Sequence, residues 1–228
     1  MKERPIIFNA EMVRAILDGR KTQTRRALRI QPTECNHTHW PEHPNSEWKH
    51  DDKGWSCAVC GNGVSLTKRD VKGITCPFGK VGDRLWVRET SGLQVRRDAL
   101  GGTGEFRVYR ASNPNAIRFT ANGKNYPIKW VPSIHMPRHA SRITLEITDV
   151  RMERLNDISE ESGIAEGVAR RHSDTYHGFY RDYENEGYGQ GCTFANDSFR
   201  SLWKSIYGAE SWEANPWVWV IEFKRMEV

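Results

Sequence analysis

A basic segment near the start of the chain combines residue types suited to hydrolysis or to binding of an anionic ligand. Residues 18–26 contain one glycine, four basic residues and two threonines: Gly19, Arg20, Lys21, Thr22, Thr24, Arg25 and Arg26. A hydroxyl attacks an acyl or amide carbonyl once a base has removed its proton. A lysine acts as that base only when burial or a nearby cation lowers its pKa enough to leave the amine neutral. Lys21 and Thr24, surrounded by arginines, fit this chemistry or a nucleotide-like ligand; the alternative is a solvated basic turn.

A short helix is expected to position this segment. Met12, Val13, Ile16 and Leu17 share one face of a helix over residues 10–17. Gly19 follows as the residue that ends the helix with a positive φ. The basic residues then leave the helix end, where the helix dipole favours cations.

The other expected elements define the fold class. Strands are predicted at 5–9, 84–90, 141–150 and 216–223, and weaker ones at 105–109 and 117–120. Helices are predicted at 157–166, with Asp157 and Glu160 forming a capping box and Gly167 ending it, and at 195–207. The apolar stripe of the second helix is Phe199, Leu202, Trp203 and Ile206. This order indicates an α+β fold, a small closed or half-closed β-barrel with helices at its rim.

Three segments in this order resemble the ASCH domains, which have a PUA-like β-barrel. They are the Gly-Arg-Lys-Thr-x-Thr-x-Arg segment at 19–26, the Gly-Asp turn and strand at 81–89, and the aromatic strand at 216–223. Segments 132–138 and 157–161 are similar to ASCH-type proteins of phages and prophages, which are often labelled morphogenetic proteins. The resemblance covers most of the chain, so residues 1–228 are expected to form one domain with insertions at 33–75 and 170–193.

The resemblance also implies an activity. Some bacterial ASCH proteins are N4-acetylcytidine amidohydrolases, and their Lys and second Thr match Lys21 and Thr24. Their catalytic Glu on a later helix corresponds to Glu166, whose alternative interpretation is a solvent-facing residue at a helix end. The amidohydrolases lack both insertions, which leaves a larger or different acylated base open as the substrate.

Further residues are expected to contact a nucleobase or phosphate. Trp86 or Trp130 would stack on a base, and Arg88 or Glu89 would pair with a base edge or phosphate. The alternatives are a Trp86 in the core, which we favour, and an ion pair between Arg88 and Glu89. The full set of expected substrate-binding residues is Arg20, Arg26, Trp86, Arg88, Glu89, Ser133, His135 and Met136.

The insertion at 33–75 carries a cysteine and histidine pattern typical of a structural zinc site. Four protein ligands would leave no open position for catalysis. A redox dithiol is the alternative for the Cys-x-x-Cys pair, and Cys76 is an alternative fourth ligand. The expected Zn²⁺ ligands come from Cys35, His37, His39, Cys57 and Cys60.

Composition permits, but does not demand, a nucleic-acid partner. The chain has 228 residues, a net charge of +5, nine tryptophans and five cysteines. An odd cysteine count without a secretory signal pattern argues against a disulfide framework. With no apolar run of 18 residues, we expect a cytoplasmic protein, in a bacterial host cell if it is phage-encoded, without membrane contact. No organic cofactor is expected, and the oligomeric state stays open.

Three functions therefore compete. The first is a hydrolase that removes an N-acyl group from a modified nucleobase or nucleoside. The second is a non-catalytic module that binds RNA, DNA or a modified nucleotide. The third is a phage morphogenesis factor, which follows only from the label of similar proteins. A binding module gains nothing from a desolvated lysine beside a threonine, so the environment of Lys21 separates the first function from the second.

Overall fold

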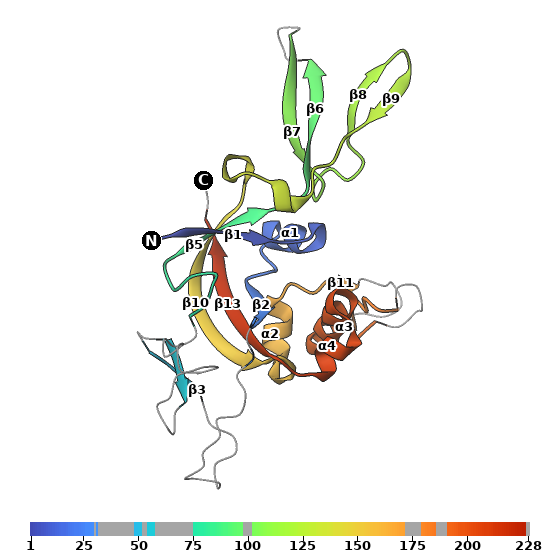
Figure 1. The fold of residues 1–228 in the computed structure, drawn as a ribbon. Coiled ribbons are helices and arrows are strands. Elements are labelled where there is room, and N and C mark those ends of the chain that lie inside the picture. The colour runs from blue at the N-terminus through green and yellow to red at the C-terminus, as the bar shows by residue number, and fades with distance from the viewer. Residues whose placement is uncertain are drawn as a thin grey trace, which may run out of the picture.

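The structure, a computed structural model, is a mixed α+β protein dominated by β-strands, as the sequence predicted (Figure 1). It describes residues 1–29, 31, 48–51, 54–57, 75–97, 102–171, 179–185 and 191–226, with the backbone assignment alone for 48–51, 54–57, 97 and 171. All structural statements below concern these residues.

A five-stranded sheet forms the body, in the order β1-β5-β10-β13-β2. β1 and β5 are parallel, and the other neighbours are antiparallel. The sheet wraps around α1 without closing through strand pairing in the described chain, so a closed barrel is not found. Arg26 Nη2, on the β2 edge, donates to the Ile7 carbonyl on the β1 edge at 2.7 Å. The strands are β1 (Glu3–Ile7), β2 (Gln23–Ala27), β5 (Arg84–Arg88), β10 (Thr144–Arg154) and β13 (Trp217–Arg225).

The strand β13, which lies between β10 and β2, is apolar on both faces because it separates two cores. Trp219, Ile221 and Phe223 pack into the first core together with β1, β5 and α1. Val218 and Val220 pack into the second core, beneath the helices that follow β10. This alternation confirms the expectation of a final strand buried on both sides.

Four α-helices cover the sheet, α1 (Ala10–Leu17), α2 (Glu160–Ala165), α3 (Ala195–Tyr207) and α4 (Ala209–Glu213). Figure 1 shows α2, α3 and α4 grouped on one side of the curved pair β10 and β13. Gly19, with φ of 74°, follows α1 as predicted. Within the described chain, none of the helices has the length and apolar character needed to cross a membrane.

The N-terminal cap of α2 differs from the prediction. Ser159, rather than Asp157, is the cap, and its hydroxyl accepts a hydrogen bond from the Ser162 amide at 3.2 Å. Asp157 lies instead in a short 3-10 turn, η3 (Leu155–Asp157). The Glu160 carboxylate accepts from the Ala195 amide at the start of α3, so the predicted capping residue joins two helices.

The predicted stripe of α3 is correct at three of its four positions. Phe199, Leu202 and Trp203 are buried against β13, whereas Ile206 is 43% exposed. The helix ends at Gly208, with φ of 86°, as expected. Ile206 lies in the last turn, beyond the region where α3 packs on the body.

The Gly-Asp turn ties β1 to β5. Gly82 has a φ of 83°, and the Asp83 carboxylate accepts from the Lys2 amide at 2.7 Å and from Arg4 Nη1 at 3.0 Å. These hydrogen bonds keep the pKa of Asp83 below its usual value. The turn therefore places the N-terminal strand parallel to β5.

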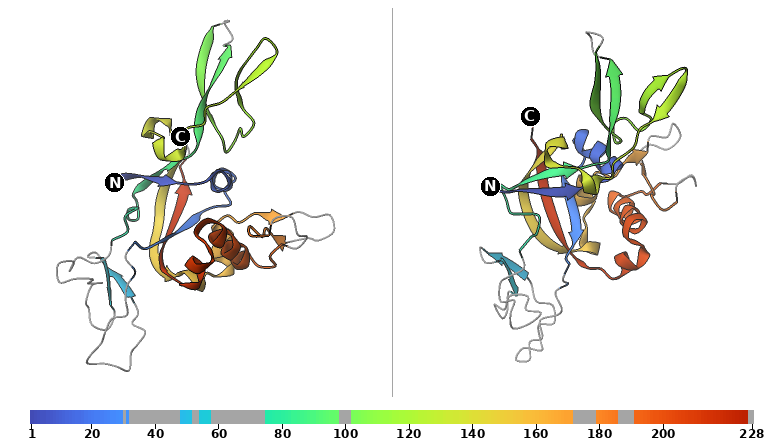
Figure 2. Two further views of the ribbon diagram at one scale, coloured as in Figure 1. Left: turned by 45° about the vertical axis from the view of Figure 1, so that its right-hand side comes forward. Right: turned by 45° about the horizontal axis from the view of Figure 1, so that its top comes forward.

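Two hairpins project from the body and form what we call the hairpin arm, residues 91–131 (Figures 1 and 2). Its strands are β6 (Ser91–Arg97), β7 (Thr103–Tyr109), β8 (Ile117–Ala121) and β9 (Lys124–Pro127). The remaining short elements are β3 (Trp48–Asp51), β4 (Gly54–Cys57), β11 (Arg170–Arg171), β12 (Phe179–Tyr180), η1 (Ser133–His135) and η2 (Arg138–Ala140).

Candidate active site

Lys21 and Glu166, predicted from separate parts of the sequence, form an enclosed ion pair. Lys21 Nζ lies 2.7 Å from Glu166 Oε2 and donates to the Glu166 carbonyl at 2.8 Å. The exposed fractions of the two side chains are 0% and 3%. A neutral amine has two N–H groups and one lone pair, so these two acceptors engage both hydrogens and leave the lone pair able to take a proton.

The local backbone explains why these residues meet. The Lys21 amide donates to the Ala15 carbonyl of α1 at 3.0 Å, and the Thr22 amide donates to the Ala165 carbonyl of α2 at 2.9 Å. The segment after α1 therefore runs between two helix ends before it enters β2. Glu166 is the residue that caps the C-terminus of α2, which brings its side chain and its carbonyl to Lys21.

Arg25 completes the coordination of the carboxylate. Its Nη1 lies 3.3 Å from Glu166 Oε1, and its Nη2 lies 2.8 Å from Glu153 Oε2 on β10. The Arg25 side chain is fully enclosed, with its guanidinium 5.8 Å from the Phe199 ring centroid. Each oxygen of Glu166 thus faces a different cation, which fixes the carboxylate in one orientation.

Burial lowers the pKa of Lys21 below its ordinary value. Desolvation is the largest cause, because the charged ammonium loses its hydration, and the nearby Glu166 carboxylate opposes it. Arg26 and Arg25 lower the pKa further. The amine of Lys21 therefore loses its proton more readily than that of an exposed lysine, which is the direction that a lysine acting as a base requires.

Thr24 lies on the opposite face of β2 from Arg25. Its antiparallel partner Ile221 belongs to the first core, so the Thr24 side chain points to that core rather than to the helices. Thr24 is buried, and its hydroxyl makes no hydrogen bond to another described residue.

Phe8 lies beside the basic groups around Thr24. Lys21 Nζ is 5.9 Å from the centroid of the Phe8 ring, and the Arg26 guanidinium is 5.3 Å from it. Arg26 is half-buried, and its Nε has no hydrogen-bond partner among the described residues. The aromatic ring thus lies near both cations and presents an apolar surface of the first core to the ion pair.

Arg20 forms a hydrogen bond at the C-terminal end of α2. Its Nη1 donates to the Gly167 carbonyl at 2.9 Å, and its Nη2 pairs with Asp18 at 3.1 Å. Together with Lys21, it satisfies carbonyl groups that a helix C-terminus leaves without partners. In this structure Arg20 therefore positions the α2 end rather than facing an open site.

Gly167 is tightly packed against Lys21. It has a φ of 80°, and an added Cβ would lie 2.6 Å from the Cβ of Lys21 and 3.0 Å from that of Ala15. We expect Gly167→Ala to displace Lys21 from Glu166, lower the free energy of unfolding by more than about 1 kcal/mol and impair any turnover. Urea denaturation and activity of this variant test the expectation, with Gly123→Ala, a positive-φ glycine in open space, as the control. Equal losses in both variants would contradict it.

Trp86 is not a core residue, contrary to the favoured alternative. Leu85 and Val87 are buried in the first core, and Trp86 and Arg88 point away from it on the other face of β5. The Trp86 ring lies 5.5 Å from the Arg88 guanidinium and 6.0 Å from that of Arg138. No described contact connects Trp86 or Arg88 with Lys21, Thr24 or Glu166, so the structure does not join these two groups of predicted residues.

Glu89 is paired, but not with Arg88. Arg142 holds the buried Glu89 carboxylate with two hydrogen bonds of 2.8 and 3.0 Å. The Glu89 amide donates to the buried Met136 sulfur at 3.5 Å. Ser133 is half-buried and His135 is exposed within η1. These residues surround the base of the hairpin arm, away from the Lys21 site.

The predicted zinc ligands Cys35, His37, His39 and Cys60 lie outside the described residues, and Cys57 is described only as the last residue of β4. Elsewhere in the described chain, His, Cys, Asp and Glu side chains do not gather into a metal-binding group. Cys76 packs against the first core, where burial raises its pKa to about 11 and disfavours the thiolate that a metal requires.

Comparison of the chain with protein-family models, curated proteins and solved structures gives no match. Any function must therefore be argued from the contacts of the site itself.

Three residues of the site were not assigned to it from the sequence. Phe8 follows an apolar strand and reads as ordinary core, and Glu153 lies within a strand of alternating charges. Arg25 was noted only as a neighbouring cation. Successive side chains of a strand point to opposite faces, so the sequence places Arg25 on the other face of β2 from Thr24. This alternation is the one sequence signal for the role of Arg25.

Proposed function

We propose that this protein is a hydrolase that removes an N-acyl group from a modified nucleobase or nucleoside. Its substrate resembles N4-acetylcytidine, in which an amide joins the acyl group to the exocyclic nitrogen of cytosine. The observation that carries the proposal is the enclosed Lys21–Glu166 pair, with a Nζ–Oε2 distance of 2.7 Å, three residues before the buried Thr24 in the same segment. The resemblance of segments 19–26, 81–89 and 216–223 to the ASCH domains supports the same activity.

The proposed reaction needs one base and one proton donor. The Thr24 hydroxyl, or a water in its place, attacks the acyl carbonyl while Lys21 Nζ takes its proton. The C–N bond then breaks, and the proton passes to the leaving amine with the help of Glu166. Water attack gives the carboxylic acid directly; attack by Thr24 gives an ester that a water then hydrolyses.

The enclosed geometry sets a condition on substrate entry. Lys21, Thr24 and Glu166 are all nearly inaccessible to solvent in this structure. The acyl group therefore reaches Lys21 only when neighbouring side chains move aside. It then takes the place of these side chains beside an ion pair that is already oriented and shielded from water. Arg26, a predicted substrate-binding residue whose Nε has no described partner, lies beside the same Phe8 ring as Lys21.

Product analysis tests the proposed function. The purified chain is incubated with N4-acetylcytidine and with longer N4-acylcytidines, and cytidine and the carboxylic acid are quantified by chromatography. We expect equimolar release of both products over many turnovers. Thr24→Val, which keeps the shape of the side chain and removes its hydroxyl, is expected to lose most of the activity if Thr24 is the nucleophile. Absence of release from every acyl chain would refute the hydrolase.

The pH dependence of turnover follows from the lowered pKa of Lys21. The base works only as the neutral amine, so kcat/KM should rise as the pH increases through the pKa of Lys21 in the free enzyme and level off above it. This rise should fall below the ordinary lysine value of about 10.4. A rate measured from pH 6 to 10 tests the expectation. A profile that is flat over this range would contradict a titrating Lys21.

A structural zinc knuckle within the 33–75 insertion is also proposed. Cys57 and Cys60, with Cys35 and one of His37 and His39, supply the ligand types that a closed tetrahedral zinc site uses. Bound zinc would cross-link a polar segment that has few apolar residues with which to form a hydrophobic core. Metal analysis of the purified chain tests this, with one equivalent of zinc expected and none in Cys57→Ser.

A further inference from the structure

The hairpin arm carries the net charge of the whole protein. Residues 91–131 contain seven Lys and Arg residues but only two Asp and Glu residues. This gives the arm a formal charge of +5, equal to that of the complete chain, so the remaining residues are balanced. A cationic projection on a neutral body concentrates the attraction for a polyanion in one place.

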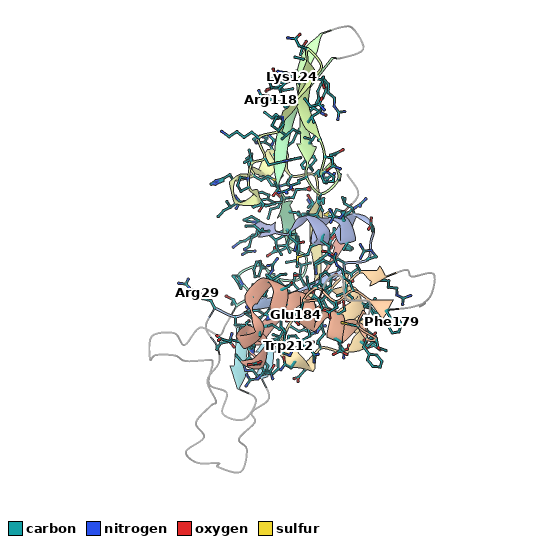
Figure 3. The ribbon with its side chains drawn as sticks, turned by 90° about the vertical axis from the view of Figure 1, so that its right-hand side faces the viewer. Arg29, Arg118, Lys124, Phe179, Glu184 and Trp212 are labelled. Carbon is teal, nitrogen blue, oxygen red and sulfur yellow. The ribbon has the colours of Figure 1, made fainter. Side chains whose placement is uncertain are left out.

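The basic side chains of the arm are available to a ligand. Glu105 is its one described acidic residue, and it pairs with exposed Arg118 at 3.5 Å. Figure 3 places Arg118 and Lys124 well away from the body residues Glu184 and Trp212. The described basic residues of the arm are all exposed: Arg96, Arg107, Arg110, Arg118, Lys124 and Lys129.

Exposed apolar side chains are interleaved with these cations. Phe106 and Tyr126 are each 43% exposed, and Leu93 is 39% exposed. The Tyr126 ring stacks on Phe119 with a centroid separation of 4.4 Å, which fixes the orientation of the outer ring. Leu93 lies opposite Arg107 in the β6–β7 ladder, so an apolar and a basic side chain share one face. Aromatic rings next to cations are the elements from which single-strand binding surfaces are built.

The base of the arm is firmly attached to the body. Ser91 and Val131 pair through backbone hydrogen bonds of 3.3 and 2.8 Å, so the arm starts and ends at one point. The Arg142 guanidinium, which holds Glu89, lies 4.1 Å from the centroid of the Tyr109 ring. The Tyr109 hydroxyl donates to the Ala140 carbonyl at 2.9 Å. A ligand held by the arm is therefore kept in a defined position relative to the sheet.

We infer that the hairpin arm binds single-stranded nucleic acid, with its cations on the phosphates and its exposed aromatic rings against unpaired bases. This inference does not depend on the hydrolase activity proposed above. A small acylated nucleoside would need no such projection, whereas a polymer carrying the modified base spans the arm and the body. If both proposals hold, the preferred substrate is an acylated base within a polynucleotide.

Charge-neutralising variants provide the first test. In the arm variant, glutamine replaces three basic residues that have no described ion pair, Arg110, Lys124 and Lys129. The matched control variant has glutamine at three exposed residues of the body, Arg29, Lys80 and Lys224. Binding of a fluorescent 20-nucleotide oligouridylate is measured by anisotropy at several salt concentrations. The slope of log K against log salt should fall by about 2 in the arm variant, because each lost phosphate contact removes about 0.7. The control should retain the wild-type slope.

Aromatic variants provide a second test with a different signature. Phe106→Ala and Tyr126→Ala should each weaken binding by about tenfold without changing the salt slope, because stacking releases no counterions. Thermal unfolding confirms that each variant is folded. Two results would overturn the inference: absence of oligonucleotide binding by the wild-type chain, or equal weakening by the arm and control variants. Because binding is read without turnover, either result leaves the hydrolase proposal to its own assay.

Discussion

Replacing Lys21 with methionine is expected to lower kcat/KM for N4-acylcytidine hydrolysis by a factor of about 10²–10⁴, the usual contribution of a general base. Methionine approximates the length of the lysine side chain but has no lone pair on nitrogen to accept the proton. Cytidine release by chromatography provides the measurement, and Lys80→Met, at an exposed position, is the matched control.

The same substitution is expected to leave the protein folded. Glu166 keeps its contact with Arg25 Nη1 at 3.3 Å, so the carboxylate is still paired when Lys21 is absent. Removing one partner of a buried ion pair is costly when the other charge is left uncompensated, and here the retained contact with Arg25 compensates the Glu166 carboxylate. Loss of activity in a folded variant identifies Lys21 as the base. Unchanged activity would contradict that role, and loss of folding would indicate a structural ion pair.

Replacing Glu166 with alanine is expected to destabilise the protein, whereas Lys21→Met is expected to lower activity in a protein that stays folded. Lys21 then retains no carboxylate partner in a fully enclosed position, and Arg25 keeps only Glu153. Breaking a buried pair from one side leaves an uncompensated charge, which costs about 3–5 kcal/mol of stability. Urea denaturation at pH 7 measures the loss. Glu161→Ala, an exposed position on the same helix, should cost less than about 1 kcal/mol.

The pH dependence of that loss has a defined sign. The Glu166 carboxylate raises the pKa of Lys21, so its removal lowers the pKa of this buried amine further. The native state then binds fewer protons than the unfolded state up to the ordinary lysine pKa, and stability increases as the pH rises through this window. The destabilisation of Glu166→Ala relative to the wild type should therefore shrink between pH 7 and 10. A loss that stays constant across this range would show that Lys21 does not titrate there.

Local patterns in the sequence predicted much of the framework. The amphipathic run 10–17, the alternation around 143–147 and the aromatic closing strand all became the expected elements, because each has a period that matches its secondary structure. Glycines with a positive φ at 19, 82, 167 and 208 ended or turned these elements as expected. Such features depend on neighbours in the chain, which a single sequence displays.

Long-range contacts explain where prediction from the sequence failed. The pairing of Glu89 with Arg142, rather than with adjacent Arg88, depends on how the arm meets the sheet. The cap of α2 shifted to Ser159 because Glu160 was taken by the amides of α3. The alternation of β5 placed Trp86 on the face away from the core, although its residue type favoured burial. In each case the partner lies far away in sequence or on another element.

The prediction of the Lys21–Glu166 contact combined both kinds of information. Lys21 and Thr24 came from a motif, and Glu166 came from matching the helix after Asp157 to the later helix that carries a catalytic Glu in the family that the chain resembles. The structure joins Lys21 and Glu166 at 2.7 Å across 145 positions of sequence. The motif does not specify Arg25 or Phe8. Arg25 adds positive charge near the amine, and the Phe8 ring helps to keep water away from it.

The account depends most directly on Lys21 having a pKa below that of an exposed lysine, so that the amine can lose its proton and act as the base. The measurement is an NMR titration of the lysine side-chain resonances in the folded protein, with the Lys21 signal identified by its absence from the spectrum of Lys21→Met. We predict a midpoint for Lys21 well below that of the exposed lysines, which should titrate near about 10.4. A Lys21 midpoint at or above that of the exposed lysines would show a permanently charged, structural ion pair and would contradict the proposed general base.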